Sequence, residues 1–328
     1  MIPDRPSDSL STPVNTPCFS ICVPAHHAER YLPAMLAAVR AQTFTDWELI
    51  LVEDGTHDRT EELLAQFARE GSQSVVFLRH AQNQGLPATR NTGIGRARGS
   101  WIVLLDDDDL WTPDHLATLA ACAVKYPAAD LIHGGSILFD SVSGRTLEVR
   151  APSPAVTAAY PRSLFLGNYC IQPSSVMLRK SLWTRVGGFD PSFRYAEDRE
   201  MWMRCAQASA IFVYTGRDTC LYRKHPTSLS SNAPRMALAC ALIFDRAAHW
   251  EGIPRRLRRI HGAEAWVSAG RIVLRSDPDT ARAYFARARG CRPTLRVWAY
   301  SAAALGLVLL HWLRRARPAP TMPVAAHD

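Results

Sequence analysis

The sequence predicts an α/β protein in which a mostly parallel central sheet is flanked by helices and followed by a C-terminal helical extension. Short apolar runs of strand length recur along the first third of the 328-residue chain, and stretches with helical spacing of apolar residues separate them. From Asn232 onward the spacing is helical throughout. Apolar strands that alternate with helices indicate a parallel sheet covered on both faces.

The first third of the chain alternates between the two kinds of element. A helical face is formed by four apolar residues, Leu32, Met35, Leu36 and Val39. Asp58 followed by Glu61 is typical of a capping box, which starts a second helix that ends near Glu70. A third helix is expected from Pro87 to about Arg98. The expected strands are residues 18–23, 48–52, 75–78 and 101–105.

After a further helix that begins near Pro113, the alternation stops. The expected elements are then a hairpin of residues 131–139 and 146–149, a surface loop at 150–163, a strand at 175–178, a helix at 197–206, strands at 211–214 and 220–222, and two packed helices with a break at residues 277–278. The chain thus divides into a disordered tail at 1–17, a body at 18–231 with halves at 18–112 and 113–231, and a helical basic region at 232–328.

Composition excludes several classes of protein. A content of 47% hydrophobic and 21% charged residues is that of an ordinary soluble globular protein and not of a disordered chain or a small disulfide scaffold. The eight cysteines form no C-x-x-C pair, which favours buried thiols and a reducing compartment. Residues 1–17 contain four prolines and lack the apolar core of a signal peptide. We therefore expect a cytoplasmic protein.

The net charge of +8 is unevenly distributed. Residues 251–317 hold 14 arginines and four acidic residues, a net charge of +10, which predicts an anionic partner. Residues 297–313 carry no formal charge, which favours an anionic membrane surface over nucleic acid as that partner. A transmembrane span needs about 20 apolar residues, so we expect a helix on the inner face of the membrane. A core-packed helix and a true span are the alternatives.

Two acidic groups follow expected strands. Asp106, Asp107, Asp108 and Asp109 come directly after the strand at 101–105, and Glu53 and Asp54 follow the strand at 48–52. Ligands of parallel sheets bind at the carboxyl ends of strands, so these groups should form one site. Adjacent carboxylates repel one another, and a divalent cation shared with substrate phosphates relieves that repulsion. A solvated acidic turn is the alternative.

Other phosphate-binding motifs are missing. Residues 93–99 resemble a dinucleotide fingerprint but have the spacing G-x-G-x-x-x-G and precede a strand, and the sequence has no P-loop motif. A third acidic group, Glu197 and Asp198, begins a helix, where a carboxylate can be only a cap. These observations leave a metal as the expected phosphate ligand.

Over residues 18–230 the motifs resemble those of the inverting family 2 glycosyltransferases, which have the glycosyltransferase A-type fold. The resemblance rests on residues 20–24, 42–44, 48–55, Gly85, Ala88, Arg90, Asn91, Gly93, 105–111, 185–190, 196–198, Met201 and Trp202. It implies that residues 18–231 are the catalytic domain, with a nucleotide-sugar half before residue 113 and an acceptor half after it. Glu53, where aspartate is common, and His26 with His27, where Tyr-Asn is more usual, depart from the family pattern.

The resemblance also implies roles for single residues. Asp54 would bind the nucleotide base, Asp106 and Asp108 the ribose and the metal-bound diphosphate, and Asp198 would be the catalytic base, with Glu197 as the second candidate. The expected substrate-binding residues are Pro24, Ala25, Glu53, Asp54, Arg90, Asn91, Asp106 and Asp107, and the expected ligands of Mg²⁺ or Mn²⁺ are Asp108 and His225.

These expectations combine into one functional hypothesis. The chain would transfer a sugar from a nucleoside diphosphate sugar to a hydroxyl of a cell-surface glycan or a lipid-linked acceptor, by metal-assisted single displacement with inversion. A sugar-phosphate nucleotidyltransferase is the enzymatic alternative, although residues 24–27 lack its usual glycine-rich phosphate loop. A non-catalytic nucleotide-sugar-binding protein is the other, although no acidic group is missing.

Overall fold

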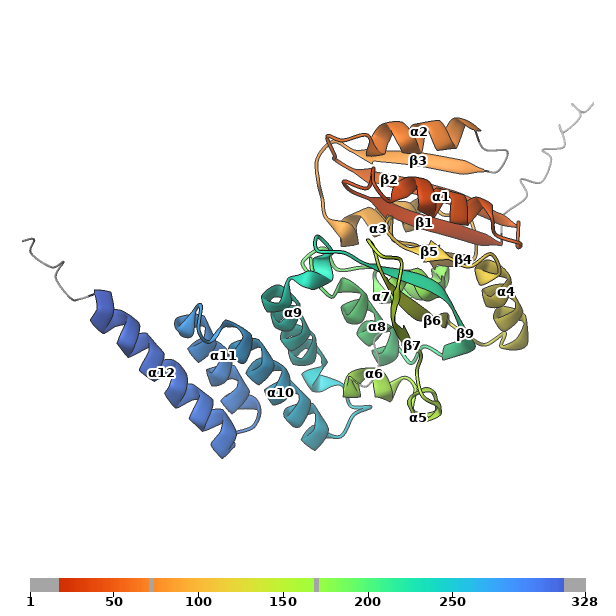
Figure 1. Cartoon of the computed structure of the whole chain (residues 1–328). Helices are drawn as coiled ribbons and strands as arrows, with labels where there is room; N and C mark the ends of the chain where they lie inside the picture. Colours follow the sequence, from red (N-terminus) through yellow and green to blue (C-terminus); the bar gives the residue numbers. More distant parts are fainter. Residues whose placement is uncertain (1–17, 71–73, 168–170, 316–328) are drawn as a thin grey trace, which may run out of the picture. The chain divides into compact units, whose positions relative to one another are not determined.

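The computed structural model describes residues 18–70, 74–167 and 171–315, and the tail expected at 1–17 lies outside them (Figure 1). The chain forms two compact units, which are described separately. The first comprises residues up to 158, 171–191 and 210–224, and the second comprises 159–170, 192–209 and 225 onward.

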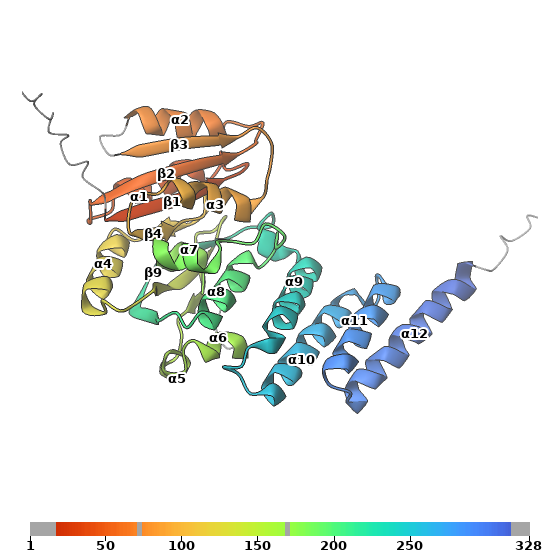
Figure 2. The same cartoon turned by 180° about the vertical axis from the view of Figure 1, so that it is seen from behind.

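The first unit is built on a nine-stranded sheet in the order β3-β2-β1-β4-β8-β6-β9-β5, with β7 paired to β6 (Figures 1 and 2). Its first four strands are parallel: β1 (Phe19–Ala25) lies between β2 (Trp47–Asp54) and β4 (Trp101–Leu104), and β3 (Val75–His80) lies beside β2. All residues of β1, β2 and β4 are buried. The expected α/β class and the parallel opening are confirmed.

The remaining strands make the sheet mixed. β8 (Val176–Arg179) is antiparallel to β4 and to β6 (Leu131–Asp140), β7 (Thr146–Arg150) and β6 form the expected hairpin, and β5 (Leu110–Trp111) is antiparallel to β9 (Phe212–Lys224). The two strands expected at 211–214 and 220–222 are this one strand, β9. Its pairing with β6 shifts register opposite Gly134 and Gly135. The extra residues of β9 form a bulge there, and the strand continues past it.

Helices cover both faces of the parallel part of the sheet. Residues 21, 23, 49 and 51 share one core cluster with α1 (Leu32–Arg40), α2 (Thr60–Glu70) and α4 (His115–Lys125). Alternate strand residues point to the other face, where Gly93 of α3 (Leu86–Arg96) lies against Cys22 and Val52. The four apolar residues expected on the first helical face are all buried in α1.

Two local expectations need correction. The capping box at α2 is only half formed: Asp58 accepts a hydrogen bond from the Thr60 N–H (3.1 Å), whereas Glu61 pairs with Arg79 on β3 (2.8 Å). The loop expected at 150–163 contains a short helix, α5 (Pro154–Ala158), because proline is tolerated in the first turn of a helix. A further helix, α7 (Lys180–Val186), follows β8 and was not expected from the sequence pattern.

The second unit is helical. Its helices are α6 (Arg162–Leu166), α8 (Glu197–Gln207), α9 (Ala233–Arg246), α10 (Arg255–Val273), α11 (Pro278–Cys291) and α12 (Leu295–Arg315). The break expected at residues 277–278 is confirmed, and the Asp277 side chain caps α11 by accepting a hydrogen bond from the Thr280 N–H (3.1 Å). Trp266 of α10 and Phe285 of α11 are buried in one cluster.

Helix α12 is partly buried and partly apolar on its outside. Val297 and Ala304 belong to the core of the second unit, whereas Trp298, Leu305 and Leu309 are about half exposed. No helix within the described part of the chain is long and apolar enough to cross a membrane. The Trp312 side chain and the arginine at 317 lie outside the part described.

A buried carboxylate holds the amino end of the sheet together. Glu48 is fully buried in β2, where it accepts hydrogen bonds from the Ser20 hydroxyl (2.6 Å) and from the backbone and side chain of Arg98 (2.6 and 2.7 Å). Burial disfavours its charged form, but the hydrogen bonds outweigh burial, and the pKa of Glu48 lies below its ordinary value.

We expect Glu48→Gln to lower the free energy of unfolding by about 2 kcal/mol, because a buried hydrogen bond to a charged group contributes roughly 1.5–3 kcal/mol. Urea denaturation measures this change. Since folding lowers the pKa of Glu48, its contribution is complete above the ordinary value of 4.5 and is lost as the pH falls through the folded-state pKa. Glu62→Gln, which removes an exposed pair with Arg59, should change little, and an equal loss in both variants would contradict the prediction.

Candidate functional site

The carboxyl ends of β1, β2 and β4 form the candidate site in the first unit. At the end of β1, Pro24 and Ala25 are buried and lie opposite Val52 and Glu53 of β2. The acidic loop, residues 106–109, follows β4 on the other side of β1. The two acidic strand ends therefore flank one strand.

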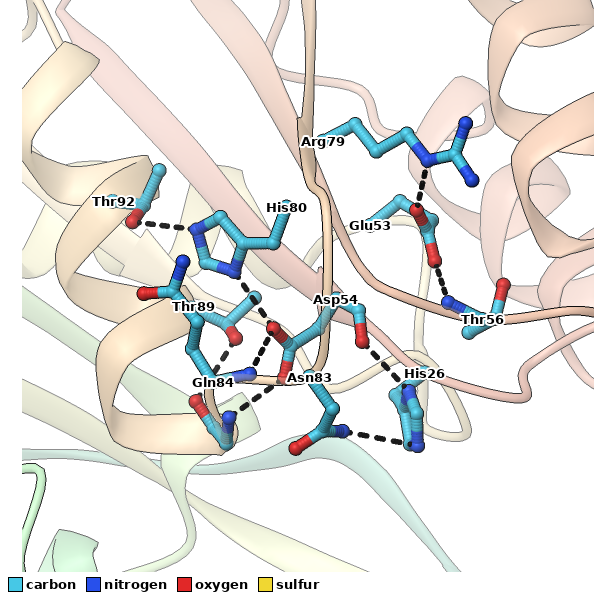
Figure 3. Close-up of polar contacts among 11 residues, drawn as sticks. His26, Glu53, Asp54, Thr56, Arg79, His80, Asn83, Gln84, Thr89 and Thr92 are labelled. Carbon is cyan, nitrogen blue, oxygen red and sulfur yellow. Dashed lines mark hydrogen bonds and ion pairs between the residues drawn. The ribbon is translucent and has the colours of Figure 1, made fainter.

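His26 joins the two acidic groups. Its backbone N–H donates to the Asp107 carboxylate (2.9 Å), and its Nδ1 bonds the Asp54 carbonyl oxygen (3.0 Å), as Figure 3 shows for the ring. Because a carbonyl only accepts, Nδ1 carries the proton, and Nε2 accepts from the Asn83 amide (3.1 Å). In the sequence, this histidine stands out only as a departure from the family pattern. Its position directly after the first strand was the available indication of a role.

Asp54 is a buried carboxylate of the site with several hydrogen-bond donors around it. Its side chain is nearly fully buried and accepts hydrogen bonds from His80 Nδ1 (2.7 Å) and from the N–H groups of Gln84 (2.9 Å) and Gly85 (2.8 Å) (Figure 3). Burial opposes ionisation, but these donors outweigh it, and the pKa of Asp54 lies below its ordinary value. Asp54 therefore fixes the loop between β3 and α3. Its expected contact with a nucleotide base stays a prediction.

Glu53 shapes the loop that follows β2. It is fully buried, and its carboxylate accepts hydrogen bonds from the Thr56 N–H and from Arg79 Nε (3.0 Å) (Figure 3). Glutamate at this position thus spans the turn to the Thr56 backbone and reaches an arginine on the neighbouring strand β3.

The acidic loop is held from several sides. Asp106 pairs with Arg90 (2.5 Å) and its N–H donates to the Ser174 hydroxyl (3.0 Å). Asp109 is fully buried and accepts from the Ser174 hydroxyl (2.6 Å) and from the Arg223 N–H (2.9 Å). These contacts fix the two ends of the loop, so that its carboxylates stay close together.

That crowding changes the acidity of the loop. Burial raises the pKa of Asp107 and of Asp109 well above the ordinary range of aspartate, and the charge of Asp108 raises both further. Burial also raises the pKa of Asp106, although the Arg90 guanidinium opposes the rise. A group of carboxylates that disfavour one another's charge is stabilised by a cation.

The loop fits a hard divalent cation as part of its ligand shell. Mg²⁺ is usually held by one or two carboxylates together with substrate phosphates and water, and Asp108 is a carboxylate of the kind that such an ion takes. Among the residues described, no three His, Cys, Asp or Glu side chains gather as a metal-binding group.

Two expected substrate-binding residues of α3 have internal partners. Arg90 is 1% exposed, and its guanidinium lies 5.3 Å from the centre of the Phe189 ring besides pairing with Asp106. Asn91 bonds both the N–H (2.9 Å) and the C=O (2.7 Å) of Phe189. A Cβ at Gly188 would lie 2.8 Å from the Asn91 amide oxygen, so the glycine allows this contact. A direct contact of Arg90 or Asn91 with the donor stays a prediction.

Three of the expected site residues belong to the second unit. Glu197, which is 6% exposed, and Asp198, which is partly exposed, begin α8. Ala196 precedes them in the left-handed conformation (φ 52°), a strain that a non-glycine residue tolerates chiefly at functional sites. The His225 ring bonds the Thr227 hydroxyl (2.8 Å). The roles expected for Glu197, Asp198 and His225 stay predictions.

The fold is similar to that of solved glycosyltransferases. The TarS fragment 1–349 of S. aureus, solved with UDP-GlcNAc, superposes with a TM-score of 0.63 over 89% of this chain and 91% of that one, at 18% identity. The mannosyltransferase PcManGT of Pyrobaculum calidifontis, solved with GDP-Man and Mn²⁺, has a TM-score of 0.57 over 95% of this chain and 86% of that one, at 19% identity. Both likenesses show the fold.

Sequence similarity then identifies the family. The sequence model described as Glycosyl transferase family 2 matches residues 20–185, about half of the chain. The chain therefore belongs to the family 2 glycosyltransferases, and the expected resemblance is confirmed. A PGL/p-HBAD biosynthesis glycosyltransferase of Mycobacterium bovis is 29% identical over 60% of this chain and 72% of its own length. An uncharacterized glycosyltransferase of Haemophilus influenzae is 24% identical over 65% and 70%.

Proposed function

We propose that the chain is an inverting glycosyltransferase that moves a sugar from a nucleoside diphosphate sugar to a hydroxyl of a cell-surface glycan or a lipid-linked acceptor. The acidic loop carries this proposal, because it lies at the carboxyl ends of the parallel strands, where ligands of such sheets bind, and because a divalent cation would relieve the repulsion among its carboxylates. The solved relatives with UDP-GlcNAc and with GDP-Man and Mn²⁺ support a nucleotide-sugar donor and a divalent cation.

The reaction divides between two acidic groups. Asp108 would hold Mg²⁺ or Mn²⁺, with His225 as the second candidate ligand, and Asp106 would contact the ribose of the donor. The bound ion would neutralise the departing diphosphate. Asp54 and His26 hold the loops around the donor site in place. Asp198 would accept the proton of the acceptor hydroxyl as it attacks the anomeric carbon. A single displacement of this kind inverts the anomeric configuration.

A panel of nucleotide sugars, incubated with the protein and Mn²⁺ or Mg²⁺, tests the proposal. We expect one donor to be hydrolysed slowly to free sugar and nucleoside diphosphate, and the rate of its consumption to rise with a suitable acceptor. Release of pyrophosphate from a nucleoside triphosphate and a sugar phosphate would instead identify a nucleotidyltransferase. Donor binding without turnover on any acceptor would identify a non-catalytic binding protein.

We also propose that the second unit docks on the anionic inner face of the cell membrane. One end of its helical region combines arginines with exposed apolar residues. This end contains the start of α10, the end of α11 and the start of α12, because Arg259 Nε in α10 donates to the carbonyl of Cys291, the last residue of α11 (2.7 Å). Leu295 is 89% and Trp298 56% exposed there. The exposed arginines at this end are Arg255, Arg256, Arg259, Arg292 and Arg296. Basic residues beside exposed apolar side chains are typical of helices that lie on anionic lipid.

We expect the charge reversal of Arg255, Arg256 and Arg292 to glutamate to weaken binding to phosphatidylserine vesicles by about 10²-fold or more, because each arginine near an anionic leaflet contributes roughly 1 kcal/mol. Sedimentation with vesicles at two salt concentrations measures this. The matched control reverses Arg271, Arg275 and Arg282, which are exposed toward the opposite end of α10 and the start of α11. Equal losses in both variants would mean that only net charge matters, and binding to RNA in place of vesicles would contradict the proposal.

A further inference from the structure

Arg223, near the end of β9, contacts the acidic loop at two points. Its backbone N–H donates to the Asp109 carboxylate (2.9 Å), and its side-chain Nε donates to the carbonyl oxygen of Asp108 (2.6 Å). Arg223 is only 9% exposed. It follows Asp108 by 115 residues, and neither the motifs nor the family resemblance assigned it a role.

Two aromatic rings hold the guanidinium in place. Its central carbon lies 4.7 Å from the ring centre of Tyr31, which precedes α1, and 4.7 Å from that of Phe139 on β6. A flat, delocalised guanidinium stacks on aromatic faces, whereas the compact, strongly hydrated ammonium of lysine does not stack in this way. The two rings therefore restrict the rotamer of Arg223 and direct its Nε toward the loop.

The loop needs such a support. Four consecutive carboxylates repel one another, and the charge of Asp108 raises the pKa of both Asp107 and Asp109. The Arg223 side chain contacts the backbone of the loop and leaves the Asp108 carboxylate itself out of this contact. A cation that acts on the carbonyl side of the turn offsets part of the repulsion without occupying the place of the metal.

We propose that Arg223 is a positioning residue of the active site, which holds the backbone of Asp108 so that the acidic loop is ready to take the divalent cation and the donor diphosphate. This inference rests on the proposed metal-dependent function. Residues that orient metal ligands typically change metal affinity or activity by about 10–100-fold when they are replaced. The rings of Tyr31 and Phe139 and the end of β9 help to hold Arg223 in this position.

The test compares Arg223→Met with Arg179→Met. Arg179 is a matched control because it also donates its Nε to a backbone carbonyl, that of Ala129 (2.8 Å), and lies 4.3 Å from the centre of the Trp101 ring. Its partners lie at the opposite end of β4 from the acidic loop. The two variants therefore lose the same kind of contact, but only one of them loses it at the proposed site.

Binding of Mn²⁺, followed by the loss of the free-ion EPR signal in the presence of UDP or of GDP, is the first measurement. We expect Arg223→Met to weaken Mn²⁺ affinity about 10–100-fold and Arg223→Lys to recover part of that loss. Arg179→Met should lower the melting temperature by a similar amount but leave the Mn²⁺ affinity unchanged. The second measurement, donor hydrolysis against Mn²⁺ concentration, should show a matching rise in the half-saturating concentration for the Arg223 variants only.

The two levels of the proposal fail in different ways. Unchanged Mn²⁺ affinity in Arg223→Met, or equal weakening in Arg179→Met, would overturn the inference about Arg223 and leave the metal-dependent function standing. A wild-type protein that binds no Mn²⁺ and hydrolyses its donor equally well in EDTA would overturn both.

Discussion

Asp108→Asn should lower metal-dependent hydrolysis of the donor by at least about 10²-fold, the scale on which single groups that stabilise developing charge act. Asp108 lies in the acidic loop between Asp107 and Asp109, and its charge raises the pKa of both neighbours. Loss of one carboxylate from this group removes a ligand of the proposed cation and the charge that raises the pKa of its neighbours. Steady-state hydrolysis over a range of Mn²⁺ concentrations measures the effect.

Asp107→Asn is the control for that prediction. The Asp107 carboxylate accepts the backbone N–H of His26 (2.9 Å), and an asparagine oxygen can accept the same hydrogen bond. We therefore expect a clearly smaller loss than for Asp108→Asn, together with a similar melting temperature. Equal losses in the two variants, or wild-type hydrolysis that EDTA leaves undiminished, would contradict the assignment of Asp108 to the cation.

Asp198→Asn should lower turnover by about 10²–10⁴, the usual contribution of a general base, and leave donor affinity nearly unchanged. The reason is that the base acts only in the transition state, so that kcat falls while the binding of the donor does not. The measurement is kcat with a saturating acceptor, together with donor affinity determined by titration calorimetry. Asparagine keeps the size of the side chain and its acceptor oxygen, which bonds the Arg199 N–H (2.7 Å) in α8.

Glu197→Gln separates the two candidates for the base. Glu197 is adjacent to Asp198 at the start of α8 but is 6% exposed, so its replacement should affect the melting temperature more than turnover. If Asp198→Asn keeps nearly full turnover and Glu197→Gln loses it, the base is Glu197. If both variants turn over like the wild type, the base does not lie at the start of α8.

Local sequence patterns were enough to predict a helix or strand that depends mainly on its own residues. The alternation of apolar runs and helical faces predicted β1 to β4 and α1 to α3 because a strand buried on both faces needs a continuous apolar run and a helix that covers it needs one apolar side. The same reasoning failed at β9, where Gly134 and Gly135 of β6 accommodate a bulge and one strand replaces the expected two. A bulge depends on the partner strand, which local sequence does not contain.

The sequence by itself determined the class of the fold and the family. It also determined that the two acidic groups lie near each other, because carboxylates directly after buried parallel strands gather at one edge of the sheet. Only the tertiary structure decided what those carboxylates contact. Asp54 is closed off by His80 and the N–H groups of Gln84 and Gly85, and the acidic loop is held by Arg90, Ser174 and Arg223. The physical reason is that hydrogen bonds and ring stacking act over a few ångströms between residues as much as 115 positions apart, a proximity that exists only once the sheet has formed.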